Sequence, residues 1–530
     1  MDLHLVSNVK LNSNTDDRKN LGYSILKKIY NELDFSSFFR TIQRKLKIEY
    51  NLNSIFSLLV FNRILHPSSK KKAFDSKDRF FEKYEFSLED IYKSLTFFNK
   101  YSLRLQKHLN DQVVKKYGRD DNIAYYDVTN YYFEIPYEDE DVIENGKVVK
   151  KGTRQKGAGK EHRPDPIRQM GLLMDSRNFP MAFNLFSGRE SEKTSLLPII
   201  RRIKKDYGIR RIIVVADRGL NTSDNTYFMS GKNDHACKNN NGYVYGQSVL
   251  GGDAKFKEYV LKKDGYTTVI KKNKDDKEYT FKSKSRVYAK KVTIKDSKGN
   301  RRLDDVIYQK QVVYWSSKYA AKQRKQRDLA IKKAEDLIAD PKKYNKAASY
   351  GVIGYINNIK FAKDTGEISD GLNLSLKLDK IAEEEKYDGY YSIVTSEIKL
   401  SDSEIIKIYG GLWEIEESFR IMKSEFKTRP VYLSIEEHID AHFLICFVSL
   451  LIFRIMEFKL ENRFTTRQIR ETLTRLECSF VHENYYMIDY RNEIVQELEK
   501  IFNMDFSNKF MKKSKIEKFL HNSKKDITIQ

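Results

Sequence analysis

The sequence predicts a mixed α/β core that carries a β-rich insertion and follows a helical N-terminal domain. Three observations predict this fold class. Apolar residues recur at helical spacing up to about residue 116, and short segments rich in β-branched and aromatic residues begin at residue 122. Alternating, Lys-rich segments then fill residues 251–386. Because 530 residues exceed what one hydrophobic core normally organises, we expect several structural units.

The predicted helical N-terminal domain covers residues 1–116. Helical periodicity is clearest in LGYSILKKIYNELDF and IFSLLVFNRIL, and Pro67 with the serine pair behind it ends the second segment. Strand-like composition replaces this periodicity soon after residue 116, so we place the domain boundary there.

The predicted α/β core comprises residues 117–250 and 387–464. Its first part contains strand segments NIAYYDVTNYYFEI, IRQMGLLMD and PMAFNLFSG, a helix near residues 192–205 and the apolar strand IRRIIVVA. Its second part resumes with YDGYYSIVTS, and two long helices follow, SDSEIIKIYGGLWEIEESFRIMKSEF and IEEHIDAHFLICFVSLLIFRIMEF. Strands joined by a crossover helix are typical of a mixed sheet.

Residues 251–386 are predicted to form a basic, β-rich insertion subdomain within this core. The segment KEYTFKSKSRVYAKKVTI alternates as a strand does, the turn sequence DSKGN follows it, and a charged helix spans about Tyr319 to Ile338. After the core, residues 465–530 show weaker periodicity and end in a basic stretch, so we expect a C-terminal helical tail.

The charge balance points to a polyanionic partner. Lys and Arg number 97 against 74 Asp and Glu, which gives a formal net charge of +23. A basic surface of this size is typical of proteins that bind nucleic acids. The alternative is a merely Lys-rich protein from an AT-rich genome, which would show the same excess.

The cysteines and the apolar stretches define the expected compartment. Cys237, Cys446 and Cys478 lie far apart without a Cys-x-x-Cys pair, which excludes a disulfide scaffold and a conventional zinc module. The first residues lack the pattern of a secretory signal, and the longest apolar stretch, Phe443 to Phe453, is too short to span a bilayer. We therefore expect a cytoplasmic protein that does not enter a membrane.

Two aspartates occupy positions where a sheet commonly presents functional groups. Asp127 interrupts the apolar and aromatic strand AYYDVTNYY, and Asp217 follows the apolar strand IIVVA directly. A charged side chain inside an apolar strand is expected only where it faces a site, which makes Asp127 a candidate. Ligands of α/β sheets bind beyond the carboxyl ends of strands, which makes Asp217 a candidate. The alternative for each is a structural role, in a turn or as a helix cap.

A third carboxylate lies in the helical segment around Trp413. Tyr409, Glu416 and Lys423 follow at intervals of seven residues, which predicts that they share one face of a helix, and Arg420 lies on the same stripe. A carboxylate flanked by cations and a tyrosine suits a site that receives phosphate beside a metal ion. The alternative is an exposed helix with ion pairs between its turns.

These segments resemble the DDE transposases of insertion sequences. YGGLWEIEESFRIMKSEF, followed by RPVY and IEEHIDAHFLICF, is similar to the family's Tyr-x2-Arg-x3-Glu-x6-Lys signature, with Tyr409, Glu416 and Lys423 at the matching positions. VVADRGL looks like the second aspartate motif and YYDVTNYYFE like the first. The resemblance covers about residues 121–457 and the early stretch RILHPSSKKKAF.

The chain departs from the signature at one position, where Leu412 replaces the arginine. Arg420 and Lys423 are the candidates to take over its contacts with DNA. Glu417 is the neighbouring carboxylate, and the positions of Tyr409 and Lys423 favour Glu416 over it.

The resemblance implies a ribonuclease H-like core in which Asp127, Asp217 and Glu416 are catalytic and bind Mg²⁺ or Mn²⁺. It further implies metal-dependent cleavage at the terminal inverted repeats of a DNA element, and transfer of the cut strand to target DNA. Two ends must be joined at once, so a homodimer or larger complex is expected. The helical domain either recognises the inverted repeats or serves packing and dimerisation.

Several side chains are expected to contact the double-stranded DNA. They are Tyr409, Arg420, Lys423, Arg218 and Trp315. For Trp315, which lies in the basic insertion and would stack on a displaced base, the alternative is a place in a small core. Two other functions remain open at this point, namely a ribonuclease H-like DNA nuclease without strand transfer and an inactive, domesticated DNA-binding protein.

Overall fold

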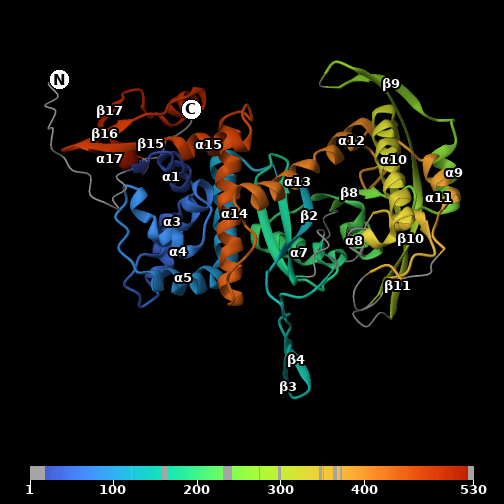
Figure 1. Cartoon of the computed structure of the whole chain (residues 1–530), viewed down its shortest axis with the longest axis horizontal. Coiled ribbons are helices and arrows are strands. Elements are labelled where there is room, and N and C mark those ends of the chain that lie inside the picture. The colour runs from blue at the N-terminus through green and yellow to red at the C-terminus, as the bar shows by residue number, and fades with distance from the viewer. Residues whose placement is uncertain are drawn as a thin grey trace.

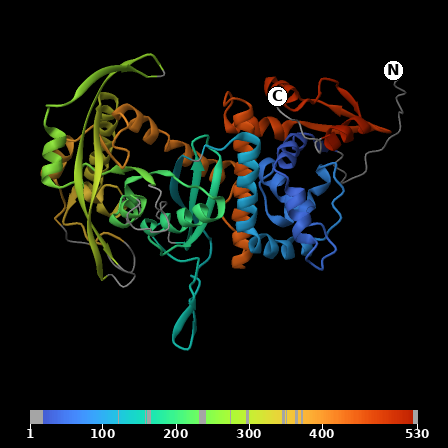
Figure 2. The same cartoon turned by 180° about the vertical axis from the view of Figure 1, so that it is seen from behind.

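The computed structural model describes residues 18–120, 122–157, 159, 165–230, 241–273, 275–295, 300–344, 349, 351–361, 367–369 and 373–522. A helical lobe and a larger sheet lobe lie on opposite sides of the long helix α14 (Glu436–Lys459) (Figure 1). The view from behind shows the same division, with the hairpin of β3 (Val142–Glu144) and β4 (Lys147–Lys150) projecting from the sheet lobe (Figure 2).

A nine-stranded mixed sheet forms the larger lobe, in the order β6-β5-β2-β7-β8-β14-β11-β10-β9. β5 is antiparallel to both β2 and β6, whereas β7 and β8 run parallel to β2. This arrangement of the first five strands confirms the expected ribonuclease H-like mixed sheet. The strands of this sheet in chain order are β2 (Ile123–Tyr132), β5 (Ile167–Asp175), β6 (Pro180–Ser187), β7 (Ile213–Ala216), β8 (Gly242–Gln247), β9 (Thr267–Lys272), β10 (Glu278–Lys295), β11 (Arg301–Ser316) and β14 (Tyr390–Thr395).

The two faces of the sheet are covered by different helices. Successive side chains of a strand point to opposite faces. Tyr126 of β2 belongs to the cluster that packs on α7 (Leu196–Tyr207), whereas Tyr125 and Tyr131 belong to the main core with α13 (Trp413–Arg420) and α14. Asp127 alternates with Tyr126, so it lies on the face covered by α13.

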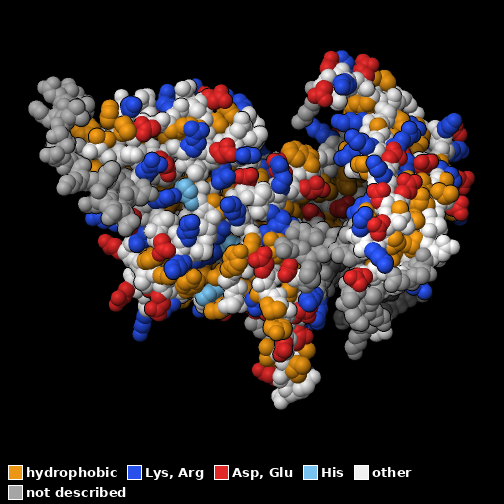
Figure 3. All heavy atoms as spheres, viewed as in Figure 1, with side chains coloured by type: hydrophobic (Ala, Val, Ile, Leu, Met, Phe, Trp, Pro, Cys, Tyr) orange, Lys and Arg blue, Asp and Glu red, His pale blue; other side chains and the backbone are white. Residues whose placement is uncertain are grey.

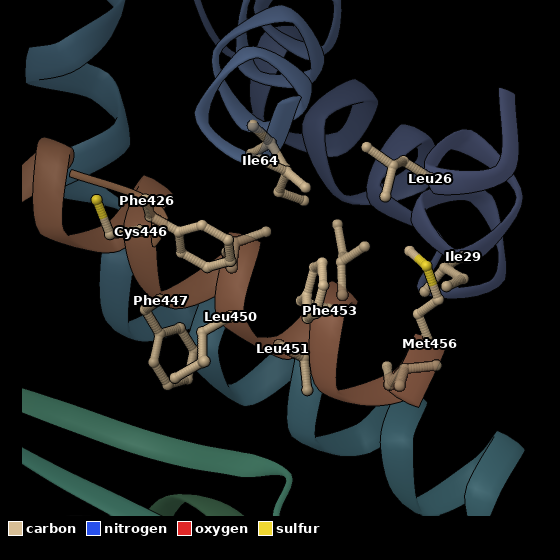
Figure 4. Close-up of a cluster of buried hydrophobic side chains, with 14 of the residues drawn as sticks. Leu26, Ile29, Ile64, Phe426, Cys446, Phe447, Leu450, Leu451, Phe453 and Met456 are labelled. Carbon is tan, nitrogen blue, oxygen red and sulfur yellow. The ribbon is translucent and has the colours of Figure 1, made fainter. Parts of the chain in front are cut away.

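The helical lobe confirms the predicted N-terminal helices and packs on α14. Figure 4 shows Leu26 and Ile29 of α1, with Ile64 of α3, beside the buried side chains of α14. On its opposite side, α14 reaches the sheet, where the rings of Phe447 and Phe183 lie 5.0 Å apart. The helices of this lobe are α1 (Tyr23–Glu32), α2 (Phe35–Gln43), α3 (Leu52–Leu65), α4 (Lys70–Asp75), α5 (Leu88–Lys100) and α6 (Ser102–Tyr117).

Helix α14 is longer than the apolar stretch from which it was predicted. Its length and its mean hydropathy of 2.0 would suit a membrane span, but 94% of its most apolar window is buried inside the protein. It is the central core helix of both lobes.

The insertion extends the central sheet. β11 pairs with β14, and β10 pairs with β11 and β9, so the three inserted strands continue the core sheet at its edge. The predicted DSKGN turn falls almost entirely outside the described residues. Five further helices and strands accompany these strands: α9 (Ala254–Leu261), α10 (Ser317–Ala339), β12 (Ile356–Asn357), β13 (Ser375–Leu376) and α11 (Leu378–Glu385).

The C-terminal segment contains strands as well as the expected helices. Three short strands join β1 (Arg18–Asn20) in a four-stranded sheet of order β1-β15-β16-β17. Their partner β1 lies at the other end of the chain, so local periodicity gave no sign of them. The elements are α15 (Thr466–Arg475), β15 (Glu477–His482), β16 (Tyr485–Ile488), α16 (Glu493–Phe502), β17 (Phe510–Lys512) and α17 (Lys513–Asn522).

Candidate active site

Asp127 and Asp217 lie side by side on neighbouring parallel strands. In the register of β2 and β7, Tyr126 is opposite Ala216, and the two aspartates are the next residues along each strand. Adjacent strands are about 4.8 Å apart. Asp127 is half-buried and Asp217 is exposed. The Asp217 carboxylate also accepts the backbone N–H of Arg218 at 2.6 Å, so it caps the short turn Arg218–Leu220.

Glu416 lies on α13, and this helix corrects one prediction. The sequence predicted one continuous helix, but the chain breaks between α12 (Asp402–Gly410) and α13. At the break, Gly411 lies so close to Tyr125 that an added Cβ would stand 2.2 Å from the phenol oxygen. The same hydroxyl donates to the Ile408 carbonyl at 3.2 Å. This close approach of β2 to the backbone, available only to glycine, ends the first helix.

Tyr409, Glu416 and Lys423 therefore do not share one face of a single helix. Tyr409 belongs to α12, Glu416 to α13, and Lys423 to the π-helical turn η6 (Ile421–Glu425). The fold nevertheless brings Tyr409 close to Asp217 and to Glu416. Burial raises the pKa of Tyr409, and the nearby carboxylates of Asp217 and Glu416 raise it further.

One cleft, of about 440 Å³, contains Asp127 and Glu416 together with the predicted cations Arg420 and Lys423. The Lys423 ammonium donates to the Thr129 hydroxyl at 2.7 Å and lies over the Tyr131 ring at 5.6 Å. Arg420 pairs with Glu417 at 2.8 Å and remains mostly exposed. Two carboxylates and three cations, with Arg429 as the third, thus line the same depression.

A second cleft, of about 530 Å³, contains Asp217, Arg218 and Tyr409. Tyrosines and glutamines form much of its remaining wall, including Tyr390, Tyr391 and Gln247. The described residues that line it do not include Trp315. The Trp315 indole donates to the Asp388 carbonyl at 2.8 Å, and the Lys282 ammonium lies 4.9 Å from its ring. Trp315 is therefore held within the insertion, where its ring lies beside that of Tyr390, a lining residue of this cleft.

The donor set suits a hard divalent cation. Carboxylate oxygens are the ligands that Mg²⁺ and Mn²⁺ prefer. Within the described residues, no group of three or more His, Cys, Asp or Glu side chains converges as a ready-made metal site. Asp127 and Glu416 share one cleft, whereas Asp217 lines the other and comes from the strand beside that of Asp127.

Comparison with known families decides the identity. A family model described as "Transposase DDE domain" matches residues 139–452, which is more than half of the chain. The chain belongs to the DDE transposase family. The matched range includes Asp217 and Glu416, whereas Asp127 precedes it.

Comparison with individual proteins adds little to this family assignment. One matching solved structure is the Mos1 transposase paired-end complex with left transposon end, with 11% sequence identity and a TM-score of 0.13. The match covers 31% of this chain and 54% of that one, so it spans about half of the solved chain's length. Among curated proteins, none matches.

In this DDE transposase, a buried polar network holds the helix that carries Glu416. Arg454 of α14 donates to the Ser418 hydroxyl at 2.7 Å and to the Glu414 carbonyl at 3.3 Å, both on α13. Its remaining amino group pairs with Glu457 at 2.8 Å, and both side chains of this pair are buried. The core helix thereby fixes the position of α13 against the sheet.

Thr129 and Arg429 are among the cleft residues of the transposase that the sequence analysis missed. Thr129 follows Asp127 by two residues and therefore points to the same face of β2, a signal that strand alternation could have supplied. Arg429 lines the cleft from the turn after η6, and its guanidinium lies 5.4 Å from the centre of the Tyr132 ring. It stands in the RPVY segment, where no local pattern marks its role.

Proposed function

We propose that this transposase cuts double-stranded DNA at the terminal inverted repeats of an insertion sequence and joins the cut strand to target DNA. Asp127, Asp217 and Glu416 are the proposed catalytic carboxylates. The observation that supports this most strongly is the position of Asp127 and Asp217, each directly after the last paired residue of two adjacent parallel strands, with Glu416 in the cleft of Asp127. The family match supports the same chemistry.

Three carboxylates in one place repel each other unless cations neutralise them. Asp127, Asp217 and Glu416 would hold Mg²⁺ or Mn²⁺, which would activate the attacking oxygen and stabilise the leaving oxygen of an in-line displacement. In the first reaction, water attacks the phosphorus and the bond to the 3′ oxygen breaks. In the second, the freed 3′-hydroxyl attacks a target phosphate, whose bond to its own 3′ oxygen breaks.

The protein's cations position the DNA for both reactions. Lys423, oriented by Thr129 and supported by Tyr131, would contact a non-bridging oxygen of the scissile phosphate. Arg420 would contact a neighbouring phosphate of the DNA backbone. Tyr409, near both Asp217 and Glu416, would orient the terminal nucleotides.

The surface offers a path for the duplex. Figure 3 shows the molecule hollowed between the helical lobe and the arm formed by the inserted strands, with Lys and Arg side chains along that arm. Helices α12 and α13 cross the base of this hollow (Figure 1). Lys and Arg interleaved with aromatic rings can neutralise phosphates and stack on bases. A homodimer acting at the cytoplasmic nucleoid would hold one DNA end in each subunit and so bring the two ends of the element together.

The test compares Glu416→Gln with Glu417→Gln, which carries the same change one residue along the helix. Each variant is incubated with Mg²⁺, a labelled duplex ending in the inverted repeat that flanks its own gene, and a plasmid target. We expect Glu416→Gln to lower strand cleavage by about a thousandfold while DNA binding persists, since several kcal/mol of transition-state stabilisation are lost. Glu417→Gln should cleave nearly as the wild type.

Other results would change the proposal. Normal cleavage by Glu416→Gln would remove this residue from the active site. Cleavage without joined products would indicate a nuclease. Binding by the wild type without any cleavage would indicate an inactive DNA-binding protein.

A further inference from the structure

A pocket of about 410 Å³ between the helical lobe and the turn after η6 collects cations without a carboxylate. Its described lining includes five basic side chains and neither Asp nor Glu. The basic residues come from three separate parts of the chain. They are Arg63, Lys70, Lys71, Lys427 and Arg429.

Two of these cations are deeply buried, since Arg63 and Lys70 each expose 5% of their surface. The Arg63 guanidinium donates to the Phe426 carbonyl at 3.1 Å and to the Ser68 carbonyl at 3.0 Å. Its Nε has no hydrogen-bond partner within the described structure. Arg63 therefore fixes the two walls of the pocket and keeps one donor unused.

Lys70 is held by a histidine. Its ammonium lies 2.7 Å from Nδ1 of His442, whose Nε2 lies 3.1 Å from the Thr428 carbonyl. Because Nε2 must donate to that carbonyl, Nδ1 is the acceptor and His442 is neutral. Within the described residues, this is the one hydrogen bond of the Lys70 ammonium, which leaves two of its N–H groups for a ligand.

The electrostatic surroundings favour an anion. Burial and the neighbouring Arg63 lower the pKa of Lys70 to about 7, and Cys446 raises it in part. Burial, Lys70 and Arg63 likewise hold the pKa of His442 well below its ordinary value. Buried cations without a counter-ion are costly, and a bound anion would offset that cost.

The pocket adjoins the candidate active site. Arg429 lines both the pocket and the cleft of Asp127 and Glu416. Lys71 and Lys427 are exposed at its rim, so a ligand can enter from the surface. We propose that this pocket binds a backbone phosphate of the DNA substrate, close along the strand to the phosphate at the carboxylates. The inference rests on the proposed function for the identity of its ligand.

Lys70→Met tests the pocket, and Lys72→Met is the matched control. Both changes remove one positive charge from α4, but Lys72 is exposed and does not line the pocket. Two measurements are made on the full-length chain without divalent metal. The first is the melting temperature over a series of inorganic phosphate concentrations, and the second is the affinity for the inverted-repeat duplex over a series of salt concentrations.

We expect phosphate to raise the melting temperature of the wild type and of Lys72→Met, but not of Lys70→Met. Lys70→Met should weaken duplex binding about tenfold and reduce the slope of log affinity against log salt by about one, as expected for one lost phosphate contact. In Lys72→Met, both the affinity and the slope should stay near wild type.

The opposite results have defined meanings. Equal phosphate response and equal DNA affinity in Lys70→Met and Lys72→Met would overturn the proposal. A phosphate response lost in Lys70→Met with unchanged DNA affinity would show a site for a free anion instead. Should Lys70→Met fail to fold, Lys427→Gln at the exposed rim must show the same two losses to a smaller degree, and their absence would also overturn the proposal.

These outcomes are separate from those of the proposed function. The phosphate series requires neither DNA nor cleavage, so it reports on the pocket even if the chain proves inactive. A wild type that binds no duplex would refute the proposed function while the phosphate series still showed whether the pocket takes anions.

Discussion

At the scale of single residues, the buried ammonium of Lys70 makes stability depend on pH. Its pKa of about 7 in the folded protein lies below its ordinary value of 10.5. Between these values the unfolded chain binds more protons than the folded one, so this group makes stability rise as pH increases from about 7 to about 10. Below pH 7 Lys70 is charged in both the folded and the unfolded protein, so the free-energy cost of burying its charge no longer changes with pH.

Denaturant unfolding across this range, in buffer without phosphate, checks the expectation. The difference in the free energy of unfolding between wild type and Lys70→Met isolates Lys70 from other titrating groups. That difference should favour Lys70→Met at pH 7 and shrink as pH rises. A difference that stays flat from pH 7 to 10 would mean that Lys70 is not held at a lowered pKa.

Leu412 shows that a sequence motif does not predict whether each of its positions is buried. Leu412 occupies the position of the signature arginine, and in this fold its side chain exposes 8% of its surface and packs in the main core. An arginine there would need a buried partner. The signature spacing could be found without the structure, but the burial of this position could not.

At the scale of elements, α14 holds α13 through Arg454, whose buried ion-pair partner Glu457 lies on α14 itself. Glu457→Ala leaves the Arg454 guanidinium buried with its charge unpaired, and we expect a loss of about 3 kcal/mol in the free energy of unfolding. Glu437→Ala, at an exposed position of the same helix, should change it by less than about 1 kcal/mol. Thermal or urea unfolding of both variants provides the measurement.

The double variant Arg454→Met with Glu457→Leu sharpens this test. Replacing both charges by apolar side chains should restore much of the stability, because no buried charge remains. It also removes the hydrogen bonds from Arg454 to Ser418 and Glu414, so α13 loses its anchor. Stability should therefore recover while strand cleavage stays low. Recovery of both stability and strand cleavage would mean that the hydrogen bonds of Arg454 do not position Glu416.

Most elements of the sheet could be predicted because their patterns are local. β5, β6 and β14 match the predicted segments within a few residues, and the apolar composition of α14 identified it as a buried helix. The break at Gly411 could not be predicted, since it depends on Tyr125 from a distant strand. The cationic pocket could not be predicted either, because Lys70 and His442 meet only in three dimensions.

At the scale of the whole molecule, one hydrophobic core joins the two lobes. The main cluster includes Leu26 and Ile64 from the helical lobe, Phe453 from α14, and Tyr131 and Val215 from the sheet. In the outer part of the insertion, helix α10 packs in a small separate cluster around Ala334 and Leu337. The lobes should therefore unfold together with the inserted strands, whereas the outer part of the insertion can open by itself.

Native-state amide hydrogen exchange measures this division. We expect α1, α3, α14 and the strands β2 and β7 to exchange slowly and with similar opening free energies. Helices α10 and α11 should exchange faster, through opening of the outer part of the insertion. Exchange of α3 at a rate close to that of α10 would show that the helical lobe opens independently of the sheet.

The order of the strands along the chain has a consequence during protein synthesis. β2 and β7 are close in sequence, so a nascent chain can set Asp127 beside Asp217 early. β14 and α13 follow the entire insertion, and α14 comes later still. Since the ribosome adds about 5 to 20 residues per second, Glu416 and the helix that anchors it emerge many seconds after the two aspartates. The proposed catalytic site is therefore completed only after the insertion, α13 and α14 have been synthesised, and a chain that stops before α13 carries the aspartates without their third partner.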